Sequence, residues 1–299
     1  MHAPPPTQID AEIGLEWAAR MVWPNETSHK HNRGRLAVVS GGALQIGAAR
    51  LSAAAGQRIG AGWVSLIGDP AAALVMAHHE TERLILARPP GHNLLELLTG
   101  FDALVIGPGL GLSPDCRMDV LSVLRGFDRP IVLDGDGLAL LAQDGAAGEL
   151  GQALQARCAP VILTPHHGEF MRLCPQAEPS QKLAATLECA KLYRAFVVYK
   201  GHQTIVATPE GRFGLSQSTT PFCASAGTGD VLAGIIGGLL AQSLEPFDAA
   251  CGGVWLHGQA ANRAGPGLIA SDLIAQLPGL LNELVPSPLK RTSPPVDRP

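Results

Sequence analysis

Short apolar runs, separated by longer segments with helical spacing, constrain the fold of this chain more than any other feature. Each run is three to five residues long, rich in Val, Ile and Leu, and too short to be a buried helix. The six runs are Leu36–Ser40, Trp63–Ile67, Ala103–Ile106, Ile131–Leu133, Val161–Leu163 and Phe196–Tyr199. Helix-like segments such as Gly47–Ile59 and Asp115–Arg125 lie between them. Because strands that alternate with helices form parallel βαβ units, the pattern predicts an α/β fold with a mainly parallel central sheet and helices on both faces.

The pattern changes after Lys200. Thr204–Ala207 and Arg212–Leu215 are predicted to form a hairpin around the turn at residues 209–211. Three predicted helices follow the hairpin, over Asp230–Gln242, Pro246–Ala264 and Ser271–Leu284.

The two ends of the chain differ from its body. We expect residues 1–10 to be a disordered N-terminus and residues 11–23 to form a short amphipathic helix. The tail over residues 286–299 is rich in proline and is expected to be disordered, because such a segment cannot build a core. With no linker or internal repeat between these ends, the sequence predicts one domain over residues 11–285.

The composition favours a small-molecule enzyme. Hydrophobic residues make up 46% of the 299 residues, charged residues 16%, and the formal net charge is -4 with no basic block, so nucleic acid is not expected as a partner. None of the six cysteines forms a C-x-x-C pair, which indicates free thiols in a reducing compartment. The N-terminus has no signal-peptide pattern, and no run reaches the ~20 apolar residues of a membrane helix. We therefore expect a cytoplasmic protein with no membrane partner.

A glycine-rich turn at residues 226–230 carries the strongest chemical signal. Gly227 and Gly229 frame a turn that leads directly into a long apolar helix. Glycine lets the backbone approach a ligand closely, and the free N–H groups at a helix start favour an anion. Asp230 would place a carboxylate beside that anion, where it could meet a substrate hydroxyl; the alternative is that Asp230 simply caps the helix.

Four further segments follow predicted strands and should lie at the carboxyl edge of the sheet, where such folds bind ligands. They are residues 106–111, 134–136, 163–169 and 199–204. Asp134 and Asp136 could hold Mg²⁺ through water or cap the next helix. Thr164 could cap a helix with Glu169 in its first turn. Lys200 could approach a phosphate or a ribose, or it could be a solvated lysine.

The histidines are open to simpler interpretations. His166 and His167 are adjacent, but no third ligand has helical spacing to either, so we do not expect a zinc site. His257 lies in an apolar helix and is interpreted as a core histidine.

Taken together, these segments resemble the ADP-dependent NAD(P)H-hydrate dehydratase family, repair enzymes with a ribokinase-like fold. The resemblance runs from about His29 to Leu284. It rests on the order of six segments and is most specific in Thr-Pro-His-x-Gly-Glu followed by Gly-Thr-Gly-Asp. The segments are residues 47–62, 107–111, 133–138, 164–169, 200–204 and 227–230. The resemblance implies a three-layer α/β/α ribokinase-like fold with a mainly parallel central sheet.

The resemblance also implies an activity: conversion of the (S)-hydrate of NADH or NADPH back to NAD(P)H, coupled to hydrolysis of ADP to AMP and phosphate. The hydrated nucleotide would lie near Ala48, Gly109, Gly111, His166 and Asp230. The adenine nucleotide, ADP or alternatively ATP, would lie on Lys200, Gly201, His202, Gln203, Thr204 and Gly229. Asp230 would accept the hydroxyl proton, the amides at Gly227 and Gly229 would hold the developing phosphoryl charge, and Mg²⁺ would bridge the polyphosphate. The ligands of that Mg²⁺ are not assigned.

The family pattern is not matched everywhere. Residues 40–42 are Ser-Gly-Gly, where the family usually has Ala-Gly-Ser, and Ala226 replaces its first glycine. The resemblance further implies a homotetramer, and it implies that the NAD(P)H-hydrate epimerase found in many bacterial members is here a separate protein.

Two other functions stay open. One is a small-molecule kinase of the same fold, acting on a vitamin precursor or a sugar, which would stop at a stable phosphate ester. The other is a nucleotide-binding regulator without turnover.

Overall fold

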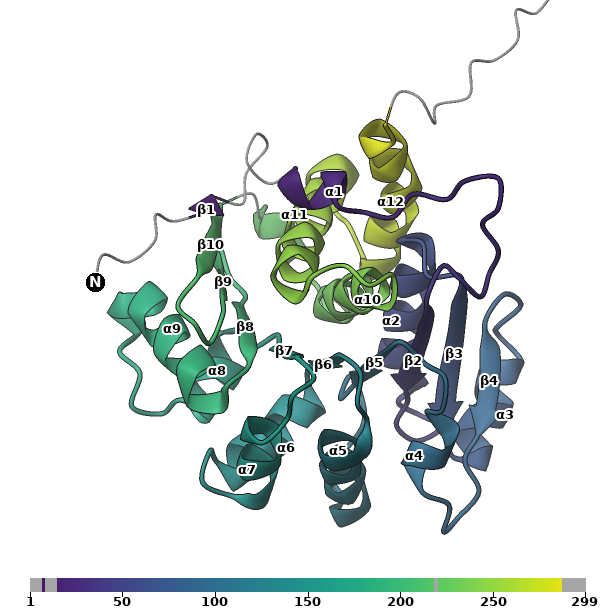
Figure 1. Ribbon diagram of the computed structural model, residues 1–299, viewed down its shortest axis with the longest axis horizontal. Coiled ribbons are helices and arrows are strands. Elements are labelled where there is room, and N and C mark those ends of the chain that lie inside the picture. The colour runs from purple at the N-terminus through teal and green to yellow at the C-terminus, as the bar shows by residue number, and fades with distance from the viewer. Residues whose placement is uncertain (1–6, 9–14, 218–219, 287–299) are drawn as a thin grey trace, which may run out of the picture.

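The computed structural model of the chain describes residues 7–8, 15–217 and 220–286. Its described strands form one sheet in the order β1-β10-β9-β8-β7-β6-β5-β2-β3-β4 (Figure 1). The strands are β1 (Thr7–Gln8), β2 (Arg35–Val39), β3 (Trp63–Gly68), β4 (Leu84–Ala87), β5 (Ala103–Ile106), β6 (Ile131–Leu133), β7 (Val161–Leu163), β8 (Phe196–Tyr199), β9 (Thr204–Ala207) and β10 (Phe213–Ser216). Strands β2 to β8 run parallel to one another, and β9 runs antiparallel to both β8 and β10.

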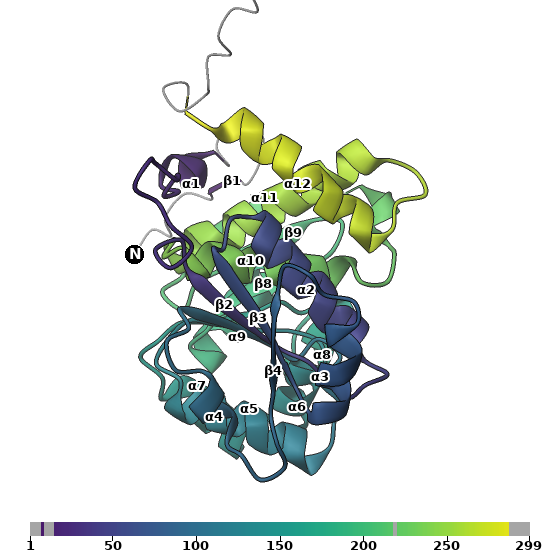
Figure 2. The same ribbon diagram turned by 90° about the vertical axis from the view of Figure 1, so that its right-hand side faces the viewer.

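Helices cover both faces of the sheet (Figures 1 and 2). One face carries α1 (Glu16–Ala19), α2 (Ile46–Arg58), α3 (Pro70–Ala77), α10 (Thr228–Ala241), α11 (Pro246–Ala264) and α12 (Ala270–Leu284). The other carries α4 (Leu94–Leu97), α5 (Pro114–Gly126), α6 (Asp136–Asp144), α7 (Glu149–Gln155), α8 (His167–Leu173) and α9 (Lys182–Tyr193). This arrangement confirms the predicted three-layer α/β/α fold.

The alternation of side chains along each strand explains why the strands are apolar throughout. In β2, Leu36 and Val38 belong to the core under α2 and α10, whereas Ala37 and Val39 belong to the core on the opposite face. Successive residues of a strand point to opposite faces, so a sheet covered on both sides needs apolar residues at every position. The central strands were predictable for this reason.

The edges of the sheet differ from the prediction. Strand β4, at one edge, was not predicted. Thr7–Gln8, which lie in the segment expected to be disordered, pair with β10 as a short parallel strand, which corrects that expectation for these two residues. The pairing uses backbone groups on the open side of β10, so it needs no apolar signal in the sequence. Residues 1–6 and 9–10 lie outside the described residues.

The predicted helix over residues 11–23 is also shorter than expected. Of its described residues, only Glu16–Ala19 are helical, with Trp17 buried against Trp255 of α11. The segment after it is held by an ion pair between Arg20 and Asp248, 2.5 Å long, rather than by further helical turns. The predicted tail lies outside the described residues beyond Pro286, and the domain limits of 11–285 stay a prediction.

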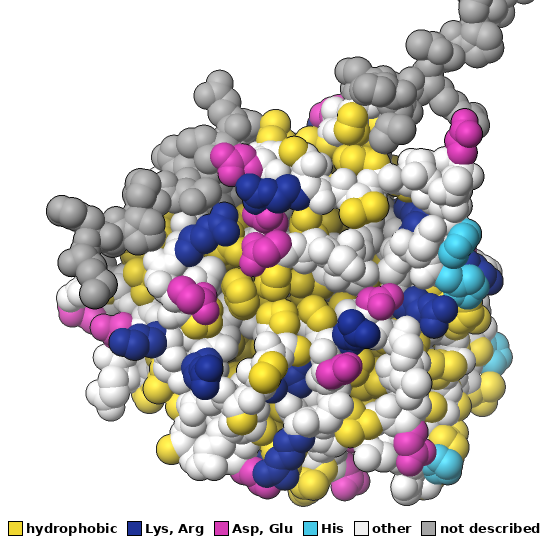
Figure 3. All heavy atoms as spheres, viewed as in Figure 1, with side chains coloured by type: hydrophobic (Ala, Val, Ile, Leu, Met, Phe, Trp, Pro, Cys, Tyr) yellow, Lys and Arg dark blue, Asp and Glu magenta, His cyan; other side chains and the backbone are white. Residues whose placement is uncertain are grey.

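Two surface properties bear on partners. No helix among the described residues is long and apolar enough to cross a membrane. On the face shown in Figure 3, Lys and Arg side chains are interspersed with Asp and Glu side chains and do not form one basic area.

Candidate active site

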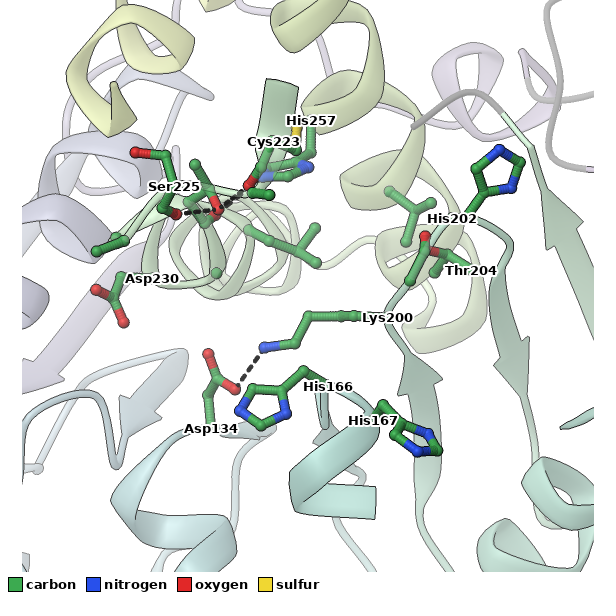
Figure 4. Close-up of a pocket in the computed structure, with 18 of the residues that line it drawn as sticks. Asp134, His166, His167, Lys200, His202, Thr204, Cys223, Ser225, Asp230 and His257 are labelled. Atoms are coloured by element: carbon green, nitrogen blue, oxygen red, sulfur yellow. Dashed lines mark hydrogen bonds and ion pairs between the residues drawn. The ribbon is translucent and has the colours of Figure 1, made fainter. Parts of the chain in front are cut away.

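A large cavity lies where the carboxyl ends of β6, β7 and β8 meet the start of α10. Its volume is about 830 Å³. The sheet contributes Asp134, His166, Lys200 and their neighbours, and the opposite wall is residues 220–230 with side chains from α10 and α11 (Figure 4). This is the position at which parallel α/β sheets bind ligands.

Gly227 makes the turn that begins α10. Its φ of +88° is in the left-handed region, and a Cβ there would lie 2.7 Å from Cδ1 of Leu51, so glycine fits both the conformation and the space. The Thr228 hydroxyl fixes the turn by donating to the carbonyls of Cys223 (3.0 Å) and Ser225 (2.9 Å). Gly227, the N-cap residue, has no side chain to cap the helix. The first backbone N–H groups of a long helix therefore face the cavity, which favours an anion there.

Asp230 is the third residue of α10, so it does not cap the helix by the usual N-cap geometry. Its carboxylate lies on the cavity wall, across from Asp134 and Lys200 (Figure 4). Burial raises its pKa to about 6, and the negative charge of Asp134 adds to the increase while Lys200 opposes it. A carboxylate of this pKa is mostly ionised at neutral pH and is a better proton acceptor than an ordinary Asp.

Lys200 and Asp134 form an ion pair below the start of α10. Nζ of Lys200 lies 3.0 Å from Oδ1 of Asp134, whose side chain is only 3% exposed. A Cβ at Gly229 would lie 3.2 Å from that Nζ, so the helix backbone comes close to the pair. The Asp134 side chain does not cap α6 but pairs with Lys200. Asp136 is in the first turn of α6 and accepts a hydrogen bond from Gly111 N–H at 2.8 Å.

His166, not Thr164, caps α8. The backbone N–H of Glu169 donates to Nδ1 of His166 (3.2 Å), and the N–H of His166 donates to the Glu169 carboxylate (2.8 Å). The prediction for Thr164 was wrong: α8 begins at His167, so His166 and not Thr164 stands in the N-cap position. Thr164 is fully buried instead. The ring of His166 lies on the cavity wall. Burial raises the pKa of the neighbouring Glu169 carboxyl group.

The predicted site residues fall into two groups. Eight of them line the cavity: His166, Lys200, Gly201, His202, Thr204, Gly227, Gly229 and Asp230. Ala48, Gly109, Gly111 and Gln203 do not. Ala48 and Gly109 are neighbours, since a Cβ at Gly109 would be 3.3 Å from that of Ala48. The hydrogen bond from Gly111 N–H to Asp136 ties the loop of residues 107–111 to the turn that carries Asp134.

His257 is both a core residue and part of the cavity wall. It is 9% exposed, and its Nε2 lies 2.9 Å from the carbonyl oxygen of Thr228. Burial lowers its pKa to about 4, so the ring is neutral at neutral pH and Nε2–H donates to the carbonyl. The core interpretation was right about burial but missed the support that His257 gives to the start of α10. Only the packing of α11 on α10 reveals it.

The fold and the site define a class: an enzyme of ribokinase-like architecture with a cavity between the carboxyl edge of the sheet and the start of α10. Residues 36–277 match the family model described as NAD(P)H-hydrate dehydratase, and the chain belongs to this family.

Similar proteins carry the same name. The chain is 36% identical over 274 residues to the ADP-dependent (S)-NAD(P)H-hydrate dehydratase of Neisseria meningitidis, covering 88% of this chain and 90% of that one. A solved structure of the Bacillus subtilis ADP/ATP-dependent NAD(P)H-hydrate dehydratase, co-crystallized with ATP and Mg²⁺, has a TM-score of 0.75 and 26% identity, covering 90% of this chain and 97% of that one. The chain spans about half the length of other curated relatives, such as the bifunctional NAD(P)H-hydrate repair enzyme of Salinibacter ruber (34% identical, 92% of this chain, 52% of that protein).

Proposed function

We propose that the chain is an ADP-dependent (S)-NAD(P)H-hydrate dehydratase that restores NADH or NADPH from the hydrate. The observation that carries the proposal is the placement of the Asp230 carboxylate beside the uncapped start of α10, across the cavity from Lys200 and Asp134. The names of the relatives with the same fold support the substrate and the nucleotide.

The site residues can perform the reaction in two steps. The hydroxyl oxygen of the hydrate attacks the β-phosphorus of ADP, the bond to AMP breaks, and the hydroxyl proton passes to Asp230. The N–H groups at Gly227 to Gly229 hold the charge on the phosphoryl oxygens, and Lys200 adds a positive charge. In the second step, the ring nitrogen donates its electron pair, the C–O bond breaks, phosphate leaves, and loss of a proton from the adjacent carbon restores the dihydronicotinamide. Hydroxide is a poor leaving group and phosphate a good one, so the nucleotide makes the dehydration feasible.

We also propose that Mg²⁺ accompanies the nucleotide. No group of three His, Cys, Asp or Glu among the described residues could hold a metal by itself. The residues do fit an ion carried by phosphate oxygens, because Mg²⁺ in such sites needs only one or two carboxylates. Asp134 would hold it, and the ion would neutralise phosphate charge.

The experiment that tests the function is turnover of NADHX with ADP, with ATP or with no nucleotide, read at the near-ultraviolet absorbance band of NADH. A nucleotide-dependent rise supports dehydration, and the faster nucleotide identifies the donor. Phosphate must appear together with NADH. Transfer to other hydroxyl acceptors with a stable ester as product would instead favour the kinase, and ADP binding with neither product would favour the regulator.

Two wider proposals go with this function. The bifunctional names of the longer relatives support cooperation with an NAD(P)H-hydrate epimerase, which would supply the (S) form. A homotetramer, supported by exposed apolar side chains such as Leu44 and Leu112, is testable by light scattering on the purified protein.

A further inference from the structure

Lys182, the first residue of α9, lies behind the loop of residues 200–203 rather than in the cavity. Its Nζ donates hydrogen bonds to the backbone carbonyls of Gln203 and of Lys200, the latter at 3.4 Å, so it joins the two ends of the loop. It also lies 4.1 Å from the ring centroid of Tyr199, at the end of β8. The other side of this loop lines the cavity through Lys200, Gly201 and His202.

The Lys182 ammonium fills the space under the loop. A Cβ at Gly201 would lie 3.0 Å from Nζ. No carboxylate pairs with Lys182 among the described residues, and burial lowers its pKa to about 8. A half-buried cation held only by carbonyls and a ring is costly. An anion on the far side of the loop would offset that cost.

We propose that Lys182 is a positioning residue of the nucleotide site: its ammonium holds the 200–203 loop from behind, and its charge favours the polyphosphate that the loop receives. This inference rests on the proposed function, because it takes the loop to bind an adenine nucleotide. Lys182 acts through the loop and touches neither the nucleotide nor the reacting atoms.

The proposal has a thermodynamic consequence. A bound polyphosphate stabilises the charged form of Lys182, so the pKa of Lys182 rises on binding and the protein takes up a proton near pH 8. By the same linkage, nucleotide affinity falls as the pH rises through about 8.

Other titratable groups surround the loop, and the test must separate them from Lys182. Tyr199 lies under the ammonium, and its hydroxyl oxygen is 2.6 Å from Nδ1 of His167. Lys200 is turned toward Asp134, and His202 is on the loop itself. Substituting Lys182 alone leaves all of these in place.

The test is calorimetric titration of the full chain with ADP, near the pKa of about 8, in two buffers of different ionisation enthalpy. We expect the wild type to take up a proton on binding. Lys182→Met should bind ADP about tenfold more weakly, from lost hydrogen bonds to a charged group, and should take up none. Lys182→Arg should keep most of the affinity but also lose the uptake, because arginine stays charged. Lys191→Met, on the exposed face of the same helix, is the matched control and should behave as wild type.

Two results would overturn the inference: wild-type ADP affinity in Lys182→Met, or undiminished proton uptake in Lys182→Arg. The proton-uptake test on Lys182→Arg can be carried out even if Lys182→Met fails to fold. A failure of the proposed function looks different, because the wild type would then bind no ADP, or would bind it without restoring NADH.

Discussion

Nζ of Lys200 lies 3.0 Å from Oδ1 of Asp134, directly below the start of α10, so the cation that faces the anion site is itself held by a buried carboxylate. The pair joins the ends of two strands, β8 and β6. The pair orients the Lys200 ammonium before any nucleotide binds. This reduces the loss of side-chain entropy on binding.

Replacing Lys200 by methionine should therefore weaken nucleotide binding more than loss of one surface charge would. We expect a loss of about 10- to 100-fold in ADP affinity, since a charge-assisted contact is removed and Asp134 is left buried without its partner. Titration calorimetry measures the ADP affinity of the variant and of the wild type. Arg125→Met, far from the cavity on α5, is the control. Unchanged ADP affinity in Lys200→Met would remove Lys200 from the nucleotide site.

Asp230→Asn should abolish turnover while nucleotide binding remains. The amide has the shape of the carboxylate but cannot accept the hydroxyl proton, so we expect kcat to fall by about 10²- to 10⁴-fold. ADP affinity should change little, because the helix N–H groups and Lys200 are kept. Turnover close to wild type in this variant would exclude Asp230 as the base.

The pH dependence of turnover should follow the Asp230 carboxylate. Its pKa is raised to about 6, and the ionised form is the active one, so kcat/KM should rise with pH through about 6 and be lost below it. The sign for stability is opposite. Because the folded protein holds this proton more tightly than the unfolded chain, the contribution of Asp230 to stability is full below the unfolded pKa of 3.8 and is lost as the pH rises through about 6.

Both effects can be measured on one pair of proteins. The dependence of wild-type kcat/KM on pH measures the effect on turnover. Melting curves of wild type and Asp230→Asn across the same pH range measure the effect on stability. The difference between the melting temperatures of the two proteins should grow as the carboxylate ionises. If kcat/KM did not change as the pH passes through about 6, the result would contradict the role of Asp230 as the base.

The sequence predicted the parts of this molecule that depend on local patterns. The strands β5 to β8 were predicted at their observed limits because burial on both faces leaves an uninterrupted apolar run. β4 was missed because its ends, Leu84 and Ala87, are exposed at the sheet edge, where the run is less clear. The glycine turn before α10 was predictable because the backbone itself demands glycine.

Pairings between distant residues were not predictable from one sequence. Lys200 and Asp134 are 66 positions apart, and neither strand end shows which partner it will meet. The contact of His257 with Thr228 depends in the same way on how α11 crosses α10. The resemblance to a family supplied the order of the site segments, but the ion pair and the support from α11 required the packed structure.

Gly227→Ala tests whether the turn at the start of α10 is as constrained as its geometry indicates. The residue has a φ of +88°, and its added Cβ would lie 2.7 Å from Leu51 and 3.0 Å from Cβ of Ala270. We expect a loss of about 1–3 kcal/mol in the free energy of unfolding, from strain at a positive φ, measured by denaturant titration. Turnover should fall more than stability explains, because the N–H groups that face the cavity move with the turn. Gly42→Ala is the matched control: its Cβ would meet nothing within 4 Å and its φ is not positive. Equal stability and turnover in the two variants would show that the turn can relax without disturbing the site.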